Sequence, residues 1–107
     1  MPMLTLIVAG SDPERLHAAL TFAAASAAIG DETRLHAHAP AVSLLLSPDA
    51  TPPAPGLPSI AQAINDAVEL GVRITLCQTG LSDAASGRFD IDGPIGVLTA
   101  GGRLVVF

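Results

Sequence analysis

The segment Val72-Arg73-Ile74-Thr75-Leu76-Cys77 is the clearest indication of how this chain folds. It is rich in β-branched and aliphatic residues, and it lies between Gly71 and the polar segment Gln78-Thr79-Gly80, so it predicts a short buried strand. A helical pattern directly precedes it, and another strand and helix lie further upstream. This alternation is typical of an α/β protein with a parallel sheet. The predicted strand ends at Cys77, the only cysteine of the chain.

The segment before this strand carries the start and stop signals of a helix. Ser59-Ile60-Ala61-Gln62 has the spacing of a capping box, and Gly71 follows the last helical residue, near Leu70. The predicted sheet-facing residues of this helix are Ile60, Ile64, Ala67 and Val68. Residues 47–58 hold five prolines and are expected to form a loop.

The first half of the chain repeats the strand–helix order. Met3–Ala9 is continuously apolar apart from one threonine, as in a central parallel strand. An alanine-rich helix follows, with either Ser11 or Asp12 as its N-cap and Gly30 as its stop signal. Thr33–His38 is the second strand, with Arg34, His36 and His38 on one face and Leu35 and Ala37 on the other, and Ala41–Leu46 is a short helical turn.

Beyond Cys77 the pattern is less regular. Thr79–Ser86 is expected to be a short helix and Arg88–Pro94 a loop, while Ile95–Ala100 fits either a strand or a helical turn. Arg103–Phe107 is the final strand. The chain is therefore predicted to be one α/β domain, residues 1–107, built as a three-layer α/β/α sandwich with a mostly parallel sheet of four to five strands.

The composition excludes several functions. All five basic residues are arginines, so a Schiff-base lysine and a P-loop lysine are excluded. A net charge of −5, without Trp or Tyr, argues against nucleic-acid binding. No segment approaches the roughly 20 apolar residues of a membrane helix. Because 50% of the residues are hydrophobic and only 14% charged, we expect a homo-oligomer.

The carboxyl ends of parallel strands are where ligands and chemistry are usually found, and Cys77 lies at such an end. Its thiol is a candidate nucleophile or sulfur carrier, or else a small buried core residue. Candidate binding residues at the same edge are Ser11, Asp12, His38, Gln78 and Thr79. If the first and third strands are neighbours, Ser11 lies beside Cys77. A single cysteine forms no internal disulfide, which fits a cytoplasmic protein.

Metal and cofactor sites are weakly supported. His36-Ala37-His38 has metal-ligand spacing, and with Cys77 it offers three ligands, but no further ligand follows at a fixed spacing. Asp90-Ile91-Asp92-Gly93 lacks the ligand pattern of a calcium loop and is interpreted as a solvated turn. Neither a bound metal nor another cofactor is therefore expected.

Several short segments occur together, in order, along nearly the whole chain. They are Gly10-Ser11-Asp12-Pro13-Glu14-Arg15-Leu16, Ala28-Ile29-Gly30-Asp31-Glu32, Ala67–Cys77, Asp90-Ile91-Asp92-Gly93 and Arg103–Phe107. With them the chain resembles the DsrE/DsrF-like family, small α/β proteins of sulfur relay. The resemblance implies a parallel sheet of about five strands and assembly into dimers, trimers or larger rings. In sulfur-transferring members, a cysteine matching Cys77 accepts sulfane sulfur as a persulfide.

Two departures from the family pattern affect how many of the family's properties can be expected of this chain. The stretch after Cys77 is polar and contains glycine, and Gly93–Gly101 is a short version of the family's fourth strand and last helix. Two hypotheses follow. The first is a cytosolic sulfur-relay, sulfurtransferase-like protein that carries a persulfide on Cys77 and exchanges sulfur with a protein donor or acceptor. The second is a non-catalytic small-ligand-binding or assembly subunit in which Cys77 is structural.

Overall fold

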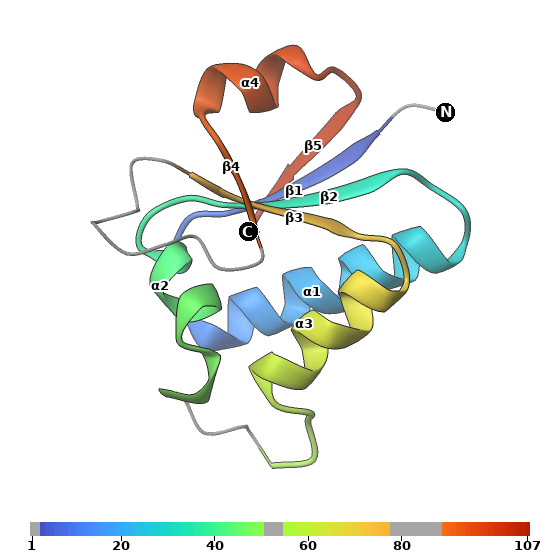
Figure 1. The fold of residues 1–107 in the computed structure, drawn as a ribbon. Helices are drawn as coiled ribbons and strands as arrows, with labels where there is room; N and C mark the ends of the chain where they lie inside the picture. The colour runs from blue at the N-terminus through green and yellow to red at the C-terminus, as the bar shows by residue number, and fades with distance from the viewer. Residues whose placement is uncertain (1–2, 51–54, 78–88) are drawn as a thin grey trace.

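The computed structural model describes residues 3–50, 55–77 and 89–107, and these form a five-stranded, entirely parallel sheet in the order β4-β3-β2-β1-β5 (Figure 1). The predicted α/β fold with a parallel sheet is confirmed. The elements are β1 (Leu4–Val8), α1 (Pro13–Ala28), β2 (Thr33–Ala37), α2 (Ala41–Leu46), the 3-10 turn η1 (Pro48–Ala50), α3 (Ile60–Glu69), β3 (Arg73–Cys77), β4 (Asp90–Asp92), α4 (Pro94–Thr99) and β5 (Arg103–Val106).

The sheet lies between two unequal helical layers. Helices α1 and α3 pack against each other and cover one face, whereas α4 lies on the opposite face (Figure 1). The main core lies on the α1/α3 side, where alternate strand residues meet the helices. Its strand residues include Leu6, Val8, Leu35, Ala37, Ile74 and Leu76. The intervening residues of β1, β2 and β3 therefore face α4.

Local capping explains where the helices begin. The Asp12 carboxylate accepts a hydrogen bond from the Glu14 N–H at 2.9 Å, so Asp12, not Ser11, is the N-cap of α1. In α3 the Ser59 hydroxyl accepts from the Gln62 N–H at 3.1 Å. The Gln62 side chain donates to Asp66 instead of returning to the cap, so only half of the predicted capping box forms.

Two details of the predicted helices and loops were wrong. Val68 is exposed, because the buried stripe of α3 consists of Ile60, Ala63, Ile64 and Ala67. Within the predicted loop 47–58, η1 adds a turn of 3-10 helix. Gly30 follows α1 with a φ of 99°, as predicted for a left-handed helix stop.

The predicted secondary structure differs most from the structure in the segment after Cys77. Asp90–Asp92 forms the edge strand β4, where a loop was predicted over Arg88–Pro94. The acidic residues suggested a turn, but they tolerate a strand here because Asp90 pairs with Arg73 of the adjacent strand β3 and Asp92 pairs with Arg34 of β2, the next strand beyond it. The ambiguous segment Ile95–Ala100 is helical, as α4, and the last strand is confirmed as β5. The helix predicted over Thr79–Ser86 lies outside the described residues.

In the described part of the chain, no helix combines the length and the hydropathy needed to span a bilayer.

Candidate functional site around Cys77

Cys77 is the last residue of β3, at the carboxyl edge of the sheet. Strand alternation places it on the α4 face together with Thr75, because Ile74 and Leu76 lie in the core under α3. Both Cys77 and Thr75 have an exposed fraction of 0%. In β4, Asp92 is the register partner of Cys77 and Asp90 that of Thr75.

The predicted neighbours of Cys77 are arranged differently from expectation. Strands β1 and β3 are not adjacent, because β2 lies between them. Ser11 and Asp12 follow β1, so they lie two strands away from Cys77 and are both exposed. The condition under which Ser11 was expected beside Cys77, adjacent first and third strands, is therefore not met. Strand order depends on long-range pairing, which a pattern of local hydrophobicity does not reveal.

His38 lies closer to Cys77 than Ser11 does. Its backbone N–H donates to the Val8 carbonyl at 2.8 Å, which extends the pairing of β2 by one residue. Because Ala37 is level with Leu76, one further step sets His38 level with Cys77. The half-buried imidazole is thus at the same edge of the sheet as the thiol. The other two predicted binding residues, Gln78 and Thr79, lie outside the described residues.

A buried polar layer extends from Cys77 across the α4 face of the sheet. Sequence analysis placed Arg34 and His36 on a common face, but it assigned no function to Arg34. It interpreted Asp92 as part of a solvated turn and did not connect it with Arg34. We use the name "polar layer" for the side chains of Thr5, Arg34, His36, Thr75 and Asp92. The signal available in the sequence was an arginine and a histidine at alternate positions of an otherwise buried strand.

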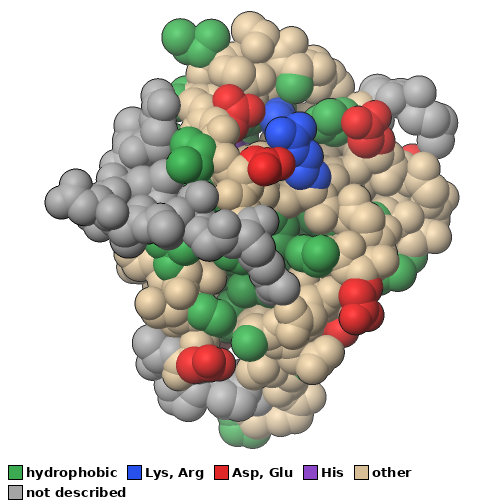
Figure 2. Space-filling model, viewed as in Figure 1, with side chains coloured by type: hydrophobic (Ala, Val, Ile, Leu, Met, Phe, Trp, Pro, Cys, Tyr) green, Lys and Arg blue, Asp and Glu red, His purple; other side chains and the backbone are tan. Residues whose placement is uncertain are grey.

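Arg34 is the centre of the polar layer and is only 3% exposed. Its guanidinium pairs with the Asp92 carboxylate at 3.4 Å, and it donates to the Thr5 hydroxyl at 3.4 Å and to the Val97 carbonyl of α4 at 3.2 Å. These bonds tie β1, β2, β4 and α4 together. Figure 2 shows basic side chains flanked by acidic ones on this side of the molecule, below α4.

His36 is equally buried, at 3% exposed. Its Nδ1 forms a 2.7 Å hydrogen bond with the Thr75 hydroxyl. Burial lowers the pKa of His36 below its usual 6.5, and the nearby Arg34 cation lowers it further, while the Asp92 carboxylate opposes this shift. The imidazole is therefore neutral at pH 7.

The polar layer contains two unsatisfied nitrogen atoms. Among the residues that the structure describes, neither Arg34 Nε nor His36 Nε2 has a hydrogen-bond partner, although both are buried. Unsatisfied buried polar atoms are rare in folded proteins because each loses its hydration without compensation. Two of them lie on one strand face, on the same side of the sheet as Cys77, while a third, His17 Nε2, belongs to α1 and lies outside the polar layer.

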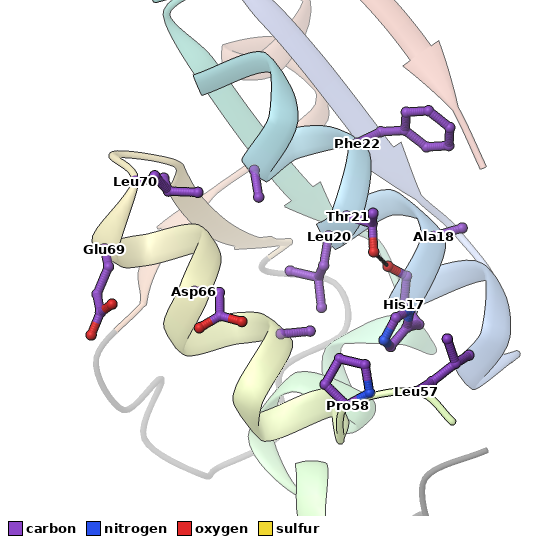
Figure 3. Close-up of a pocket in the computed structure, with 12 residues that line it drawn as sticks. His17, Ala18, Leu20, Thr21, Phe22, Leu57, Pro58, Asp66, Glu69 and Leu70 are labelled. Carbon is purple, nitrogen blue, oxygen red and sulfur yellow. Dashed lines mark hydrogen bonds between the residues drawn. The ribbon is translucent and has the colours of Figure 1, made fainter. Parts of the chain in front are cut away.

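A separate groove lies on the outer surface of the α1/α3 layer. It has a volume of about 950 Å³, with His17 and Pro58 at one end and Glu69 and Leu70 at the other (Figure 3). The sheet and the helical layer both separate it from the α4 face. The groove therefore offers space for a ligand but does not belong to the site around Cys77.

The described residues contain no group of three or more His, Cys, Asp or Glu side chains that can hold a metal ion. His36 and His38 differ in their surroundings: His36 is held in the polar layer, while His38 lies beyond the end of the strand.

The fold and the site together define a parallel α/β protein with one thiol at the carboxyl edge of its sheet. A family model described as the DsrE/DsrF-like family matches residues 3–85, more than three-quarters of the chain. The chain belongs to this family. The matched region includes β1 to β3, and with them Arg34, His36 and Cys77, whereas Asp92 and α4 lie beyond it. No curated protein matches the chain.

Proposed function

We propose that this protein is a cytoplasmic sulfur-relay protein, sulfurtransferase-like in its chemistry, that carries sulfane sulfur as a persulfide on Cys77. The observation that carries this proposal is the position of the chain's only cysteine at the carboxyl end of β3, within the region matched by the DsrE/DsrF-like family. Membership of that family suggests a function of the sulfur-relay type, and the persulfide on Cys77 is the specific form proposed here.

The transfer step needs no oxidant. The Cys77 thiolate attacks the terminal sulfur of a donor persulfide, R–S–SH, and forms a new S–S bond. The donor's own S–S bond breaks, and its electron pair leaves with the thiolate R–S⁻. Delivery to an acceptor thiol repeats the same exchange, with Cys77 as the leaving thiolate. The donor and acceptor are expected to be low-molecular-weight or protein persulfides and thiols.

The proposal includes assembly of the chain with copies of itself. Ile95 and Leu98 on α4 and Val106 on the edge strand β5 are exposed, although all three are large apolar residues. A homo-oligomer would cover such side chains. Light scattering is expected to give a multiple of 10.8 kDa at micromolar concentration, and a monomer would contradict this part of the proposal.

The decisive experiment measures the reactivity of the thiol. Native protein is incubated with glutathione persulfide and analysed by intact mass spectrometry, and the rate of alkylation by iodoacetamide is followed as a function of pH. We expect a gain of one sulfur atom in the native protein and none in Cys77→Ser, which contains no thiol at all. Native protein that never gains sulfur, with a thiol that is alkylated only after unfolding, would overturn the proposal.

One observation favours the alternative function. Cys77 is 0% exposed, as expected for a structural cysteine in a non-catalytic binding or assembly subunit. The groove between α1 and α3 then becomes the place for a small ligand, since its volume lies in the range of small-molecule sites. The same experiment separates the two functions, because a structural cysteine neither gains sulfur nor reacts in the folded state.

A further inference from the structure

We propose that Arg34 and His36 form the binding subsite for the terminal sulfur of a persulfide on Cys77. This inference rests on the proposed function and names the residues that would hold the transferred atom. It starts from the two buried nitrogen atoms, Arg34 Nε and His36 Nε2, that have no partner among the described residues.

The first step of the argument is chemical. A persulfide is more acidic than its parent thiol and carries its negative charge on the terminal sulfur at neutral pH. Such an anion needs N–H donors when it is held away from water. Arg34 Nε always carries a hydrogen. The 2.7 Å contact between His36 Nδ1 and the Thr75 hydroxyl fits either tautomer of the neutral imidazole, and the proposal assigns the hydroxyl as the donor, which places the hydrogen of the imidazole on Nε2. With this assignment, both unsatisfied atoms are donors.

The second step is geometric. Arg34, His36, Thr75 and Cys77 share one face of the sheet, and His36 is level with Thr75. Cys77 is two residues further along the neighbouring strand, so its Cα lies roughly 8 Å from that of His36, given the usual rise and spacing of strands. The imidazole ring and a cysteine side chain lengthened by one sulfur atom can close this gap between them.

The third step concerns charge. The Arg34 guanidinium lies between the carboxylate of Asp92, the register partner of Cys77, and the hydroxyl of Thr5, which is level with Arg34 itself. Arg34 thereby supplies a fixed positive charge in a layer from which water is excluded. Asp92 is 31% exposed and is partly solvated, so it offsets only part of that charge at the thiol.

The test is the exchange equilibrium between glutathione persulfide and the Cys77 thiol, read by mass spectrometry as the ratio of persulfide to thiol forms. We expect His36→Asn and Arg34→Met each to lower this ratio about tenfold, as for the loss of a hydrogen bond to a charged group. Thr75→Val should lower it as well, because the hydroxyl fixes the imidazole. The matched control is Arg73→Met, which removes an exposed arginine from the same face of β3.

The outcomes separate the subsite from the function. If native protein gains sulfur on Cys77 and the ratio is unchanged in the folded variants, the subsite is wrong while the relay function stands. If native protein gains no sulfur, both the proposed function and this inference are wrong. Circular dichroism establishes which variants are folded. Should Arg34→Met fail to fold, His36→Asn and Thr75→Val still test the subsite by the same ratio.

Discussion

Two arginine–aspartate pairs join β4 to the sheet, and they allow a sharp test of how burial sets the strength of an ion pair. Arg73 and Asp90 are 3.1 Å apart, but their side chains are 58% and 64% exposed. Arg34 and Asp92 are 3.4 Å apart, with Arg34 only 3% and Asp92 31% exposed. Distance alone ranks the first pair as the stronger, whereas burial ranks the second pair far above it.

We predict that Asp92→Asn lowers the free energy of unfolding by about 2–3 kcal/mol and Asp90→Asn by less than about 1 kcal/mol. Exposed pairs contribute about 0–1 kcal/mol. Removing one partner of a fully buried pair costs about 3–5 kcal/mol, because the other charge remains buried and uncompensated. The partial exposure of Asp92 reduces that figure. Asparagine retains the oxygen that accepts the Gly93 N–H at 2.8 Å, so the substitution removes mainly the charge.

Equilibrium unfolding in urea measures both changes, and a double-mutant cycle isolates the pair. In an Arg34→Met background the buried cation is absent, so Asp92→Asn should then cost less than about 1 kcal/mol. Equal losses for Asp92→Asn and Asp90→Asn, or a coupling energy below about 0.5 kcal/mol between Arg34 and Asp92, would refute the reasoning. A loss of unfolding free energy that occurs in Asp92→Asn but not in Asp90→Asn, and that disappears in the Arg34→Met background, would show that burial sets the strength of the ion pair.

Three further predictions follow from capping, titration and backbone conformation. Asp12→Ala should lower the free energy of unfolding by about 1 kcal/mol, and Ser11→Ala by almost nothing, because only Asp12 caps α1; urea unfolding of the pair checks this. Because burial lowers the pKa of His36 in the folded state, the unfolded chain binds more protons than the folded chain below pH 6.5, and the free energy of unfolding should decrease as the pH is lowered until it passes the folded-state pKa. His36→Asn should flatten this dependence, measured by urea unfolding from pH 8 to pH 5. Gly102→Ala should destabilise far more than Gly30→Ala, because both have positive φ but only at Gly102 would a Cβ overlap the Met3 backbone; equal melting temperatures for the two variants would contradict this.

Much of the fold was predictable because its signals are local. Buried parallel strands are continuous apolar runs, and the helices between them carry caps and glycine stops that depend only on neighbouring residues. For this reason β1, α1, β2 and α3 were found within one or two residues of their observed bounds. The alternation within Thr33–His38 also placed Arg34 and His36 correctly on one face.

What failed depends on contacts between distant residues. The order of the strands, with β2 between β1 and β3, is set by tertiary packing and leaves no trace in local periodicity. Strand β4 is three residues long and acidic, so local propensity favoured a turn. Arg34, the ion-pair partner of Asp92 in β4, lies 58 residues earlier in the chain. The polar layer was missed for the same reason, because its contacts reach into the segment after Cys77.

The polar layer itself bears on which function is correct. A sheet face covered by a helix is most simply built from apolar side chains, yet here an arginine and a histidine are buried, each with a nitrogen atom that no described residue satisfies. Such an arrangement lowers stability, and a structural cysteine would gain nothing from it. An anion formed on Cys77 would be stabilised by this arrangement, because donors that are already buried need no reorganisation when the negative charge forms. The burial of Cys77 taken alone fits a structural cysteine, whereas the unsatisfied nitrogen atoms beside it favour sulfur transfer.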